Sequence, residues 1–361
     1  MAAARAEPAA NGPDRTAIAI EALDRLKGMD LGANPRLKAA VMNVLASTRG
    51  TPDFVKIVQD FNLKDQNAGL LEVAMKNPGA ESGVQAMHLI LAGQGQGLVE
   101  QALQGADIAA AAKTAEALGN TGDKQIVPLL LPLVTDARRD LALRKQAVRS
   151  LAQIQDGAAA LLKLAGEDKL PGDLKFTAGA ELNRVRWPDL KAGAARLLPL
   201  PQGRNTEPLP PLADLLAMKG DPQKGALVFA RQEVGCINCH RVNDKGVDFG
   251  PALSEIGTKL GKDALYEAIL DPSAGIAFGY EAWDIELKSG DAAFGLIVSE
   301  TIDELTLKDA KAIPTRIKKS DITSRRQLKT SIMPAGLQQT MSTQDLADLV
   351  EYLSTLKKAV K

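Results

Sequence analysis

The first half of the chain carries a helical pattern of hydrophobic and polar positions. Across residues 16–198, apolar and small residues recur at i, i+3 and i+4, which is the period of amphipathic helices. The pattern is clearest in segments 34–47, 81–92 and 108–118. Gly, Pro and Asp interrupt it at short intervals. The first half is therefore predicted to be a series of short helices joined by tight turns.

These helical segments recur as pairs. A helix ending at Leu118 is followed by a Gly/Asp-rich turn and the apolar segment 126–130. A second helix ending near Leu151 is followed by a similar turn and the segment 158–164, at an offset of about 33 residues. The pattern resembles degenerate HEAT-type repeats, and the resemblance implies an α-solenoid. Since solenoids present extended surfaces to other proteins, residues 16–198 are predicted to be a docking platform or a spacer.

Composition marks two segments outside this domain. Residues 199–211 contain five prolines, which fix φ and remove backbone donors, so this segment is predicted to be an extended linker and the domain boundary. Residues 1–15 are rich in Ala, Pro, Asn and Gly and are predicted to be a disordered tail.

The second half, residues 212–361, mixes two periods. A helix is predicted after Asp221, with Pro222 in its first turn, and another at 342–357, with Ser342 as its N-cap. Between them, apolar and polar residues alternate with a period of two, and Ser289-Gly290-Asp291 is a hairpin signal. The pattern predicts a small antiparallel sheet inserted at about 280–324, with strands at 281–287, 292–299, 304–308 and 315–319.

Composition narrows the class of protein. The 361 residues include 44 basic and 44 acidic side chains, so the formal net charge is zero and gives no case for binding nucleic acid. Aromatic residues make up only 3%, which favours a mainly α fold. No apolar run approaches the ~20 residues of a transmembrane helix, so no transmembrane segment is predicted.

The strongest chemical signal is the sequence Cys236-Ile237-Asn238-Cys239-His240. It contains both cysteines of the chain and one of its two histidines. Two thiols at this spacing can bond the two vinyl groups of one porphyrin, and the adjacent imidazole then ligates the iron. The C-x-x-C-H motif therefore predicts one covalently attached haem c, held by Cys236 and Cys239, with His240 as proximal iron ligand.

Two other interpretations of the motif remain open. A C-x-x-C pair can be a redox dithiol, although that chemistry usually has a βαβ context that the flanking sequence lacks. The pair can also be half of a zinc site, although a closed site needs about four ligands and the sequence offers no second Cys/His pair.

The helices that flank this motif resemble the first and last helices of class I cytochromes c. Gly225 and Phe229 match the first helix and Tyr352 the last, and the resemblance implies that these helices cross closely. In the loop after the motif, Pro251 matches the proline whose carbonyl accepts the N–H of the proximal histidine. The resemblance thus implies that Pro251 orients His240.

The resemblance also implies a second axial ligand. Met333, in Ser331-Ile332-Met333-Pro334, matches the Met-Pro segment that precedes the last helix of such cytochromes. The alternatives are that Met333 fills a gap in the core, or that Met341, which has no matching motif, is the ligand.

Residues 215–358, approximately, resemble a haem-binding domain of planctomycetes and verrucomicrobia. The stretches 280–283, 295–300 and 331–337 carry this likeness. In that family the domain ends large secreted proteins with HEAT-like repeats and dehydrogenase-like β-propellers. In such a domain Tyr280 and Trp283 either cover the haem or pack in the sheet.

Electron transfer is the leading functional prediction. His/Met ligation leaves no open iron site, so the chain is expected to exchange electrons with a redox partner, a dehydrogenase or another cytochrome, rather than to act as an enzyme. The alternative is a haem enzyme or gas sensor with an open or displaceable sixth position. His88 and Trp187 are expected to be structural.

An exported, periplasmic location is also predicted. In bacteria, haem is attached through thioethers outside the cytoplasm, whereas the N-terminus here lacks the apolar core of a signal peptide. The chain is therefore interpreted as a processed or recombinant piece of a longer precursor.

Overall fold

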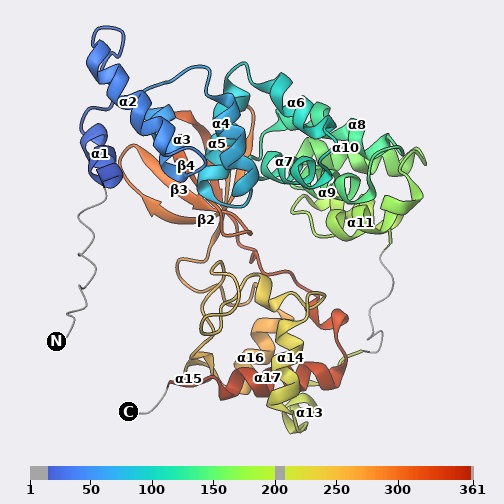
Figure 1. The fold of residues 1–361 in the computed structure, drawn as a ribbon. Coiled ribbons are helices and arrows are strands. Elements are labelled where there is room, and N and C mark those ends of the chain that lie inside the picture. Colours follow the sequence, from blue (N-terminus) through green and yellow to red (C-terminus); the bar gives the residue numbers. More distant parts are fainter. Residues whose placement is uncertain (1–14, 200–207, 359–361) are drawn as a thin grey trace, which may run out of the picture. The chain divides into compact units, whose positions relative to one another are not determined.

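The computed structural model describes residues 15–199 and 208–358 (Figure 1). The predicted disordered tail lies outside the described residues except for Arg15, where the first helix begins. Residues 200–207 of the predicted linker also lie outside the described residues. The first half is helical, as the periodicity predicted. Its helices are α1 (Arg15–Asp24), α2 (Pro35–Ser47), α3 (Pro52–Asp60), α4 (Asn67–Lys76), α5 (Glu81–Ala92), α6 (Gln96–Gln104), α7 (Ile108–Asn120), η1 (Lys124–Ile126), α8 (Val127–Thr135), α9 (Leu141–Leu151), α10 (Gln155–Gly166), α11 (Gly172–Leu182) and α12 (Pro188–Leu197).

Short-range sequence signals explain where these helices begin. Asn34 caps α2 by accepting a hydrogen bond from the Leu37 N–H at 3.1 Å, and Asp107 caps α7 in the same way. The two leucines that mark the predicted repeat, Leu118 and Leu151, are both completely buried. The predicted series of short helices is therefore confirmed, and both leucines of the predicted repeat lie in its core.

The chain divides into two compact units, and the division falls inside the helical repeats. The first unit comprises residues 1–121 and 138–150, and the second comprises residues 122–137 and 151–361. Within the first unit, α7 and α9 are in close contact, and the Ser150 hydroxyl of α9 donates to the Ala115 carbonyl of α7 at 2.7 Å. The predicted domain boundary at 199–211 lies within the second unit and stays a prediction.

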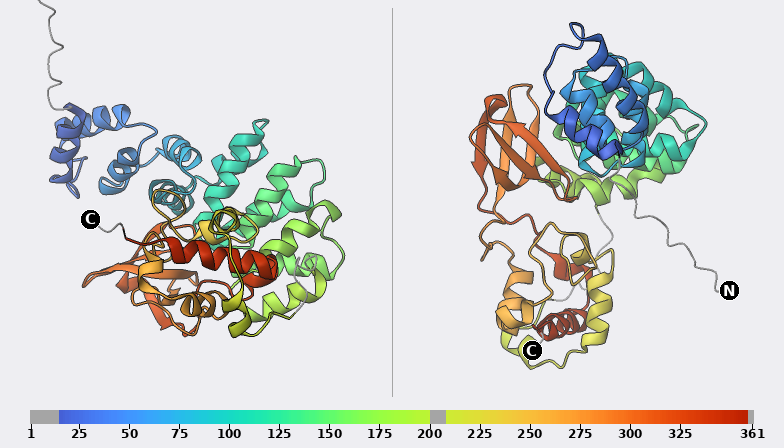
Figure 2. Two further views of the ribbon diagram at one scale, coloured as in Figure 1. Left: turned by 90° about the horizontal axis from the view of Figure 1, so that it is seen from below. Right: turned by 60° about the vertical axis from the view of Figure 1, so that its left-hand side comes forward.

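The predicted antiparallel sheet is present in the second unit, as the twisted orange layer in Figure 2. Its strand order is β4-β3-β2-β1-β5, and its core consists of Ile285, Leu305, Leu307 and Ile317. The turn at Ser289-Gly290-Asp291 is confirmed, with Gly290 at φ 83°. The strands are β1 (Ala282–Leu287), β2 (Ala292–Glu300), β3 (Glu304–Lys308), β4 (Pro314–Lys318) and β5 (Ile322–Gln327).

The sheet differs from its prediction at one edge. The insertion does not end near 324, because β5 adds a fifth strand that pairs antiparallel with β1. Only Ile322 of β5 is partly buried, and the rest of the strand is exposed. An edge strand with no buried face carries no alternating pattern, so the period-two criterion could not detect it.

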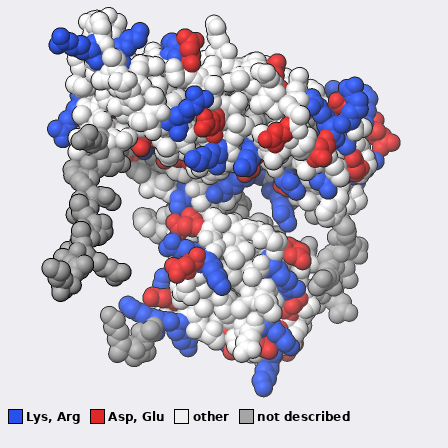
Figure 3. All heavy atoms as spheres, viewed as in Figure 1, with Lys and Arg blue, Asp and Glu red and all other residues white. Residues whose placement is uncertain are grey.

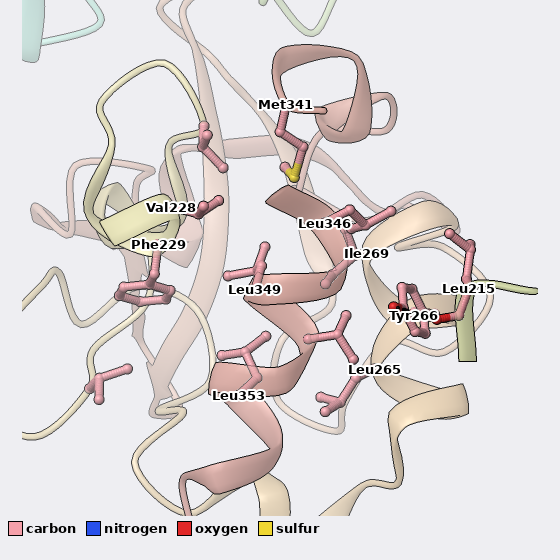
Figure 4. Packing of buried hydrophobic residues seen from close by; sticks show 13 residues of the cluster. Leu215, Val228, Phe229, Leu265, Tyr266, Ile269, Met341, Leu346, Leu349 and Leu353 are labelled. Carbon is pink, nitrogen blue, oxygen red and sulfur yellow. Dashed lines mark hydrogen bonds between the residues drawn. The ribbon is translucent and has the colours of Figure 1, made fainter. Parts of the chain in front are cut away.

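The remaining helices form a second core around α17. Figure 4 shows Val228 and Phe229 packing on α17 from one side, and Leu265 and Ile269 from the other. Figure 2 shows the same arrangement, with α17 between α14 and α16. The elements are α13 (Leu212–Ala217), α14 (Pro222–Ala230), η2 (Cys236–Asn238), α15 (Ile256–Lys259), α16 (Lys262–Leu270), η4 (Leu337–Thr340) and α17 (Thr343–Thr355).

The α14–α17 crossing has the close approach that the sequence predicted. A Cβ atom added at Gly225 would lie 1.9 Å from the Asp348 carbonyl oxygen, so only glycine fits there. The rings of Phe229 and Tyr352 make a tilted contact, with an interplanar angle of 57° and their centroids 6.0 Å apart. The buried Asp348 carboxylate accepts from the Asp221 N–H at 2.8 Å and thereby fixes the start of α14 against α17.

The fold class is thus mainly α with a small antiparallel sheet, as predicted, whereas a cytochrome-like organisation of the last helices stays a prediction. Among the residues that the structure describes, no helix is long and apolar enough to cross a membrane. Basic and acidic side chains are interspersed over the face seen in Figure 3.

Candidate functional site

The C-x-x-C-H motif lies on a tight turn that follows α14. Gly235, at φ 81°, begins the short 3-10 helix η2. The N–H groups of Cys239 and His240 both donate to the Cys236 carbonyl, at 3.2 and 2.9 Å. Cys236, Cys239 and His240 therefore lie on one helical turn, as the spacing of the motif predicted.

The loop after the motif folds back on it. The N–H groups of Phe249 and Gly250 both donate to the Cys239 carbonyl, at 3.2 and 2.7 Å, and the Leu253 N–H donates to the Arg241 carbonyl at 2.8 Å. The backbone of residues 236–253 is thus tied into one compact loop that holds the motif in place.

His240 is held by two contacts from this loop. Its Nδ1 lies 2.8 Å from the Pro251 carbonyl oxygen, the contact that the resemblance implied. Because a carbonyl only accepts, Nδ1 carries the proton, and Nε2 keeps the lone pair in the neutral ring. A Cβ at Gly250 would lie 2.6 Å from Cε1 of the ring, so the glycine leaves the space in which the ring sits.

Burial determines the protonation of these groups. Desolvation raises the pKa of the Cys236 thiol to about 11 and also raises the pKa of Cys239. Desolvation lowers the pKa of His240, while the hydrogen bond to Pro251 acts in the opposite direction. At neutral pH the thiols are protonated, which is unlike the attacking thiol of a redox dithiol, whose pKa is lowered. Both cysteines are free of a disulfide.

Met333 lies in a different segment at the edge of the same core. Its side chain is partly buried and packs, like Cys236, on the cluster around α17. The Ser331 hydroxyl accepts a hydrogen bond from the Met333 N–H at 3.1 Å. The Ser273 hydroxyl in turn accepts from the Ser331 N–H at 3.1 Å. Two hydroxyl groups therefore fix the backbone of the Met333 segment.

Met341, the competing methionine, has another environment. It is 0% exposed and contributes its side chain to the core, with its sulfur beside the first turn of α17 (Figure 4). The structure thus places Met341 as a core residue and Met333 at the surface of that core.

The aromatic candidates belong to the sheet and the repeats. Trp283 packs on the sheet core with the guanidinium of Arg325 5.4 Å from its ring centre, so the structure supports the second of its two interpretations. Trp187 occupies the N-cap position of α12, as expected for a structural residue. His88 is half-buried within α5.

The donor atoms fit a c-type haem in their chemistry. Two free thiols lie on one turn, and the imidazole of His240 has its Nε2 available as a ligand. Gly250 leaves the space that the His240 ring occupies. Within 15–199 and 208–358, no group of three or more His, Cys, Asp or Glu side chains is placed to hold a metal ion.

Three contributors escaped the sequence analysis. The glycine beside the proximal histidine was visible only as part of Phe249-Gly250-Pro251, and the serine pair 273/331 is far apart in sequence. The third is Arg186, which makes an ion pair with Asp284 of β1 at 2.7 Å. No periodic or motif signal marks such long-range polar pairs.

Comparison with known proteins identifies one part of the chain. Residues 95–183 match the family model for HEAT repeats, in agreement with the helices α6 to α11 described above. Comparison with curated proteins gives no match. The chain therefore contains HEAT repeats, which are typical of protein–protein interaction.

Proposed function

We propose that this protein is a c-type cytochrome that transfers electrons, with the HEAT repeats as the platform for its partner. The observation that carries the proposal is the environment of His240. Its Nδ1 is engaged by Pro251, so Nε2 is the nitrogen that can ligate iron, next to two free thiols on the same turn.

Each residue of the site has a distinct task in this proposal. Cys236 and Cys239 form the thioether bonds, and Pro251 keeps His240 in one orientation and tautomer. Met333 would supply a thioether sulfur as a second ligand to the iron, and such a ligand would favour the reduced state and raise the reduction potential. When bound, the haem supplies a one-electron carrier.

The redox partner would be a protein that binds the repeats, such as a dehydrogenase or another cytochrome. With a net charge of zero and mixed surface charges (Figure 3), long-range steering is weak, so recognition has to be local. The proposal includes export, because bacterial thioether attachment takes place outside the cytoplasm.

Covalent attachment can be tested by acid–organic extraction of protein made in cells with a haem-attachment system. We expect the haem to stay with the denatured chain, and to be lost in Cys236→Ala/Cys239→Ala. His240→Ala should lose the low-spin spectrum, whereas His88→Ala, the matched control at the other histidine, should retain it. Haem that is extracted from the wild-type chain would contradict the proposal.

The sixth position can be tested by optical spectra with and without carbon monoxide. A long-wavelength Met-to-ferric band that disappears in Met333→Ala, together with no carbon monoxide binding by the reduced wild type, would support an electron carrier. Immediate carbon monoxide binding by the wild type would instead favour a haem enzyme or gas sensor.

A further inference from the structure

One carboxylate on the sheet is shared by two arginines from different parts of the second unit. Asp284 on β1 contacts Nη1 of Arg186 through Oδ1 at 2.7 Å, and Nη2 of Arg326 through Oδ2 at 3.2 Å. Arg186 lies between the repeat helices α11 and α12, whereas Arg326 belongs to β5. The carboxylate therefore links the last repeat to the edge strand.

Arg186 is built into this position. Its guanidinium lies 5.0 Å from the ring centre of Trp187 and 4.7 Å from that of Phe294 on β2. Its side chain is 21% exposed and that of Asp284 is 27% exposed, so the ion pair is partly shielded from water and salt. The arginine thus joins the repeat to two strands, through one ion pair and one ring contact.

A second contact supports the same attachment. The Lys124 ammonium donates to the Ser289 carbonyl at 3.2 Å, and the Lys124 N–H donates to Asp291 Oδ1 at 3.3 Å. Lys124 begins η1 in the repeats, and the two acceptors lie in the β1–β2 turn. The sheet is therefore attached to the repeats at two sites.

The same sheet leads directly into the Met333 segment. β5 ends at Gln327, and the Leu328 N–H donates to the Ala282 carbonyl at 2.8 Å. Residues 328–336 belong to no helix or strand in the described chain. Between the sheet and η4, the backbone N–H groups of Ser331 and Met333 each donate one hydrogen bond to a serine hydroxyl. Where the sheet lies therefore limits where Met333 can lie.

We propose that Arg186 is a positioning residue for Met333, acting through Asp284 and Arg326. The turn between α11 and α12 holds the sheet through Arg186, the sheet includes β5, and the Met333 segment follows β5 in the chain. A partner that binds the last repeat and competes for Arg186 would loosen this segment. The consequence at the iron rests on the proposed function, whereas the positioning does not.

Hydrogen exchange of the whole chain tests the positioning without any cofactor. In Arg186→Ala and Arg326→Ala we expect the amides of 328–336 to exchange about tenfold faster, while Arg186→Lys recovers part of the protection. Arg325→Ala is the matched control, because Arg325 is the neighbour of Arg326 on β5 but pairs with Glu300 at 2.8 Å. Arg326 is 73% exposed, so this variant keeps the test valid if Arg186→Ala unfolds.

Unchanged exchange at 328–336 in both variants, or equal acceleration in Arg325→Ala, would overturn the proposal. In haem-loaded protein, Arg186→Ala should also weaken the Met-to-ferric band and allow the reduced protein to bind carbon monoxide, whereas Arg325→Ala, like the wild type, should keep the band and bind none. A chain that carries no haem would refute the proposed function, while the exchange data would still decide the positioning.

Discussion

Replacing Gly225 by alanine tests the most specific packing contact of the second core. The new Cβ would lie 1.9 Å from the Asp348 carbonyl oxygen and 2.7 Å from Tyr352 Cβ. Real Cβ atoms stay at least about 3 Å from other heavy atoms, so α14 and α17 would have to separate by roughly 1 Å. Both obstacles are rigid, because one is backbone and the other is the first atom of a packed aromatic side chain.

The cost follows from two opposing contributions. Overpacking of a well-packed contact costs about 1–3 kcal/mol, and a backbone clash belongs at the upper end. Alanine regains about 1 kcal/mol of helix propensity. The net expectation is a loss of about 2 kcal/mol, which corresponds to a roughly 30-fold larger equilibrium constant for opening of the helix pair.

Peptide-resolved hydrogen exchange is the appropriate assay, because both tryptophans, Trp187 and Trp283, lie outside this core. Amides of α14 and α17 should lose protection together. Gly172→Ala is the matched control, since a Cβ there meets no described atom within 4 Å and should leave these helices unchanged. Wild-type protection of α14 and α17 in Gly225→Ala would refute the inferred crossing geometry.

Three further outcomes are expected. Met341→Ala should destabilise the core by about 2–5 kcal/mol, measured by denaturant unfolding, yet leave the proposed sixth ligand in place. Met333→Ala should remove that ligand and cost less stability. Ser331→Ala should increase hydrogen exchange at Met333 and, in haem-loaded protein, lower the reduction potential measured by spectroelectrochemical titration. An unchanged potential would show that the Ser331 hydroxyl does not help to place the Met333 ligand. At the start of α17, burial alone would raise the pKa of Asp345, but the Ser342 N–H and Arg231 outweigh it and hold the pKa below its usual 3.8. The lowered pKa contributes stability that is fully present above pH 3.8 and is lost as the pH falls through the pKa of Asp345 in the folded protein. Asp345→Asn should therefore reduce the loss of stability at acid pH. Ser342→Ala should cost about 1 kcal/mol at any pH, and an acid limb that persists in Asp345→Asn would contradict the assignment.

Local signals in the sequence predicted most of the fold. Ser342 and Asp345 form the capping box that begins α17, and the segment Glu81–Ala92 is a helix with the predicted bounds. β5 was missed because Ile322 is its one partly buried residue, so the strand has no buried face. Its place in the sheet is set by backbone pairing with β1. Backbone pairing of an exposed edge leaves no trace in the hydrophobic pattern.

The candidate site divides in the same way. The C-x-x-C-H motif is local, so its residues and their order could be predicted directly. Gly250 meets His240 only because the loop after the motif folds back on it. The serine pair joins residues 58 positions apart, and the ion pair of Arg186 with Asp284 joins residues 98 positions apart. Polar pairs across such separations follow from the tertiary fold and cannot be derived from composition or spacing.

The contact between α14 and α17 also has a consequence for how the chain folds. Asp221 and Asp348, which join the two helices, are 127 positions apart. Closing a flexible loop of that length costs about 4 kcal/mol of chain entropy, which local contacts within either helix cannot offset. The hairpins of the sheet form between them from near neighbours and shorten the effective loop. The repeats and hairpins should therefore form early, and the core around α17 should assemble last, as the slow step of folding.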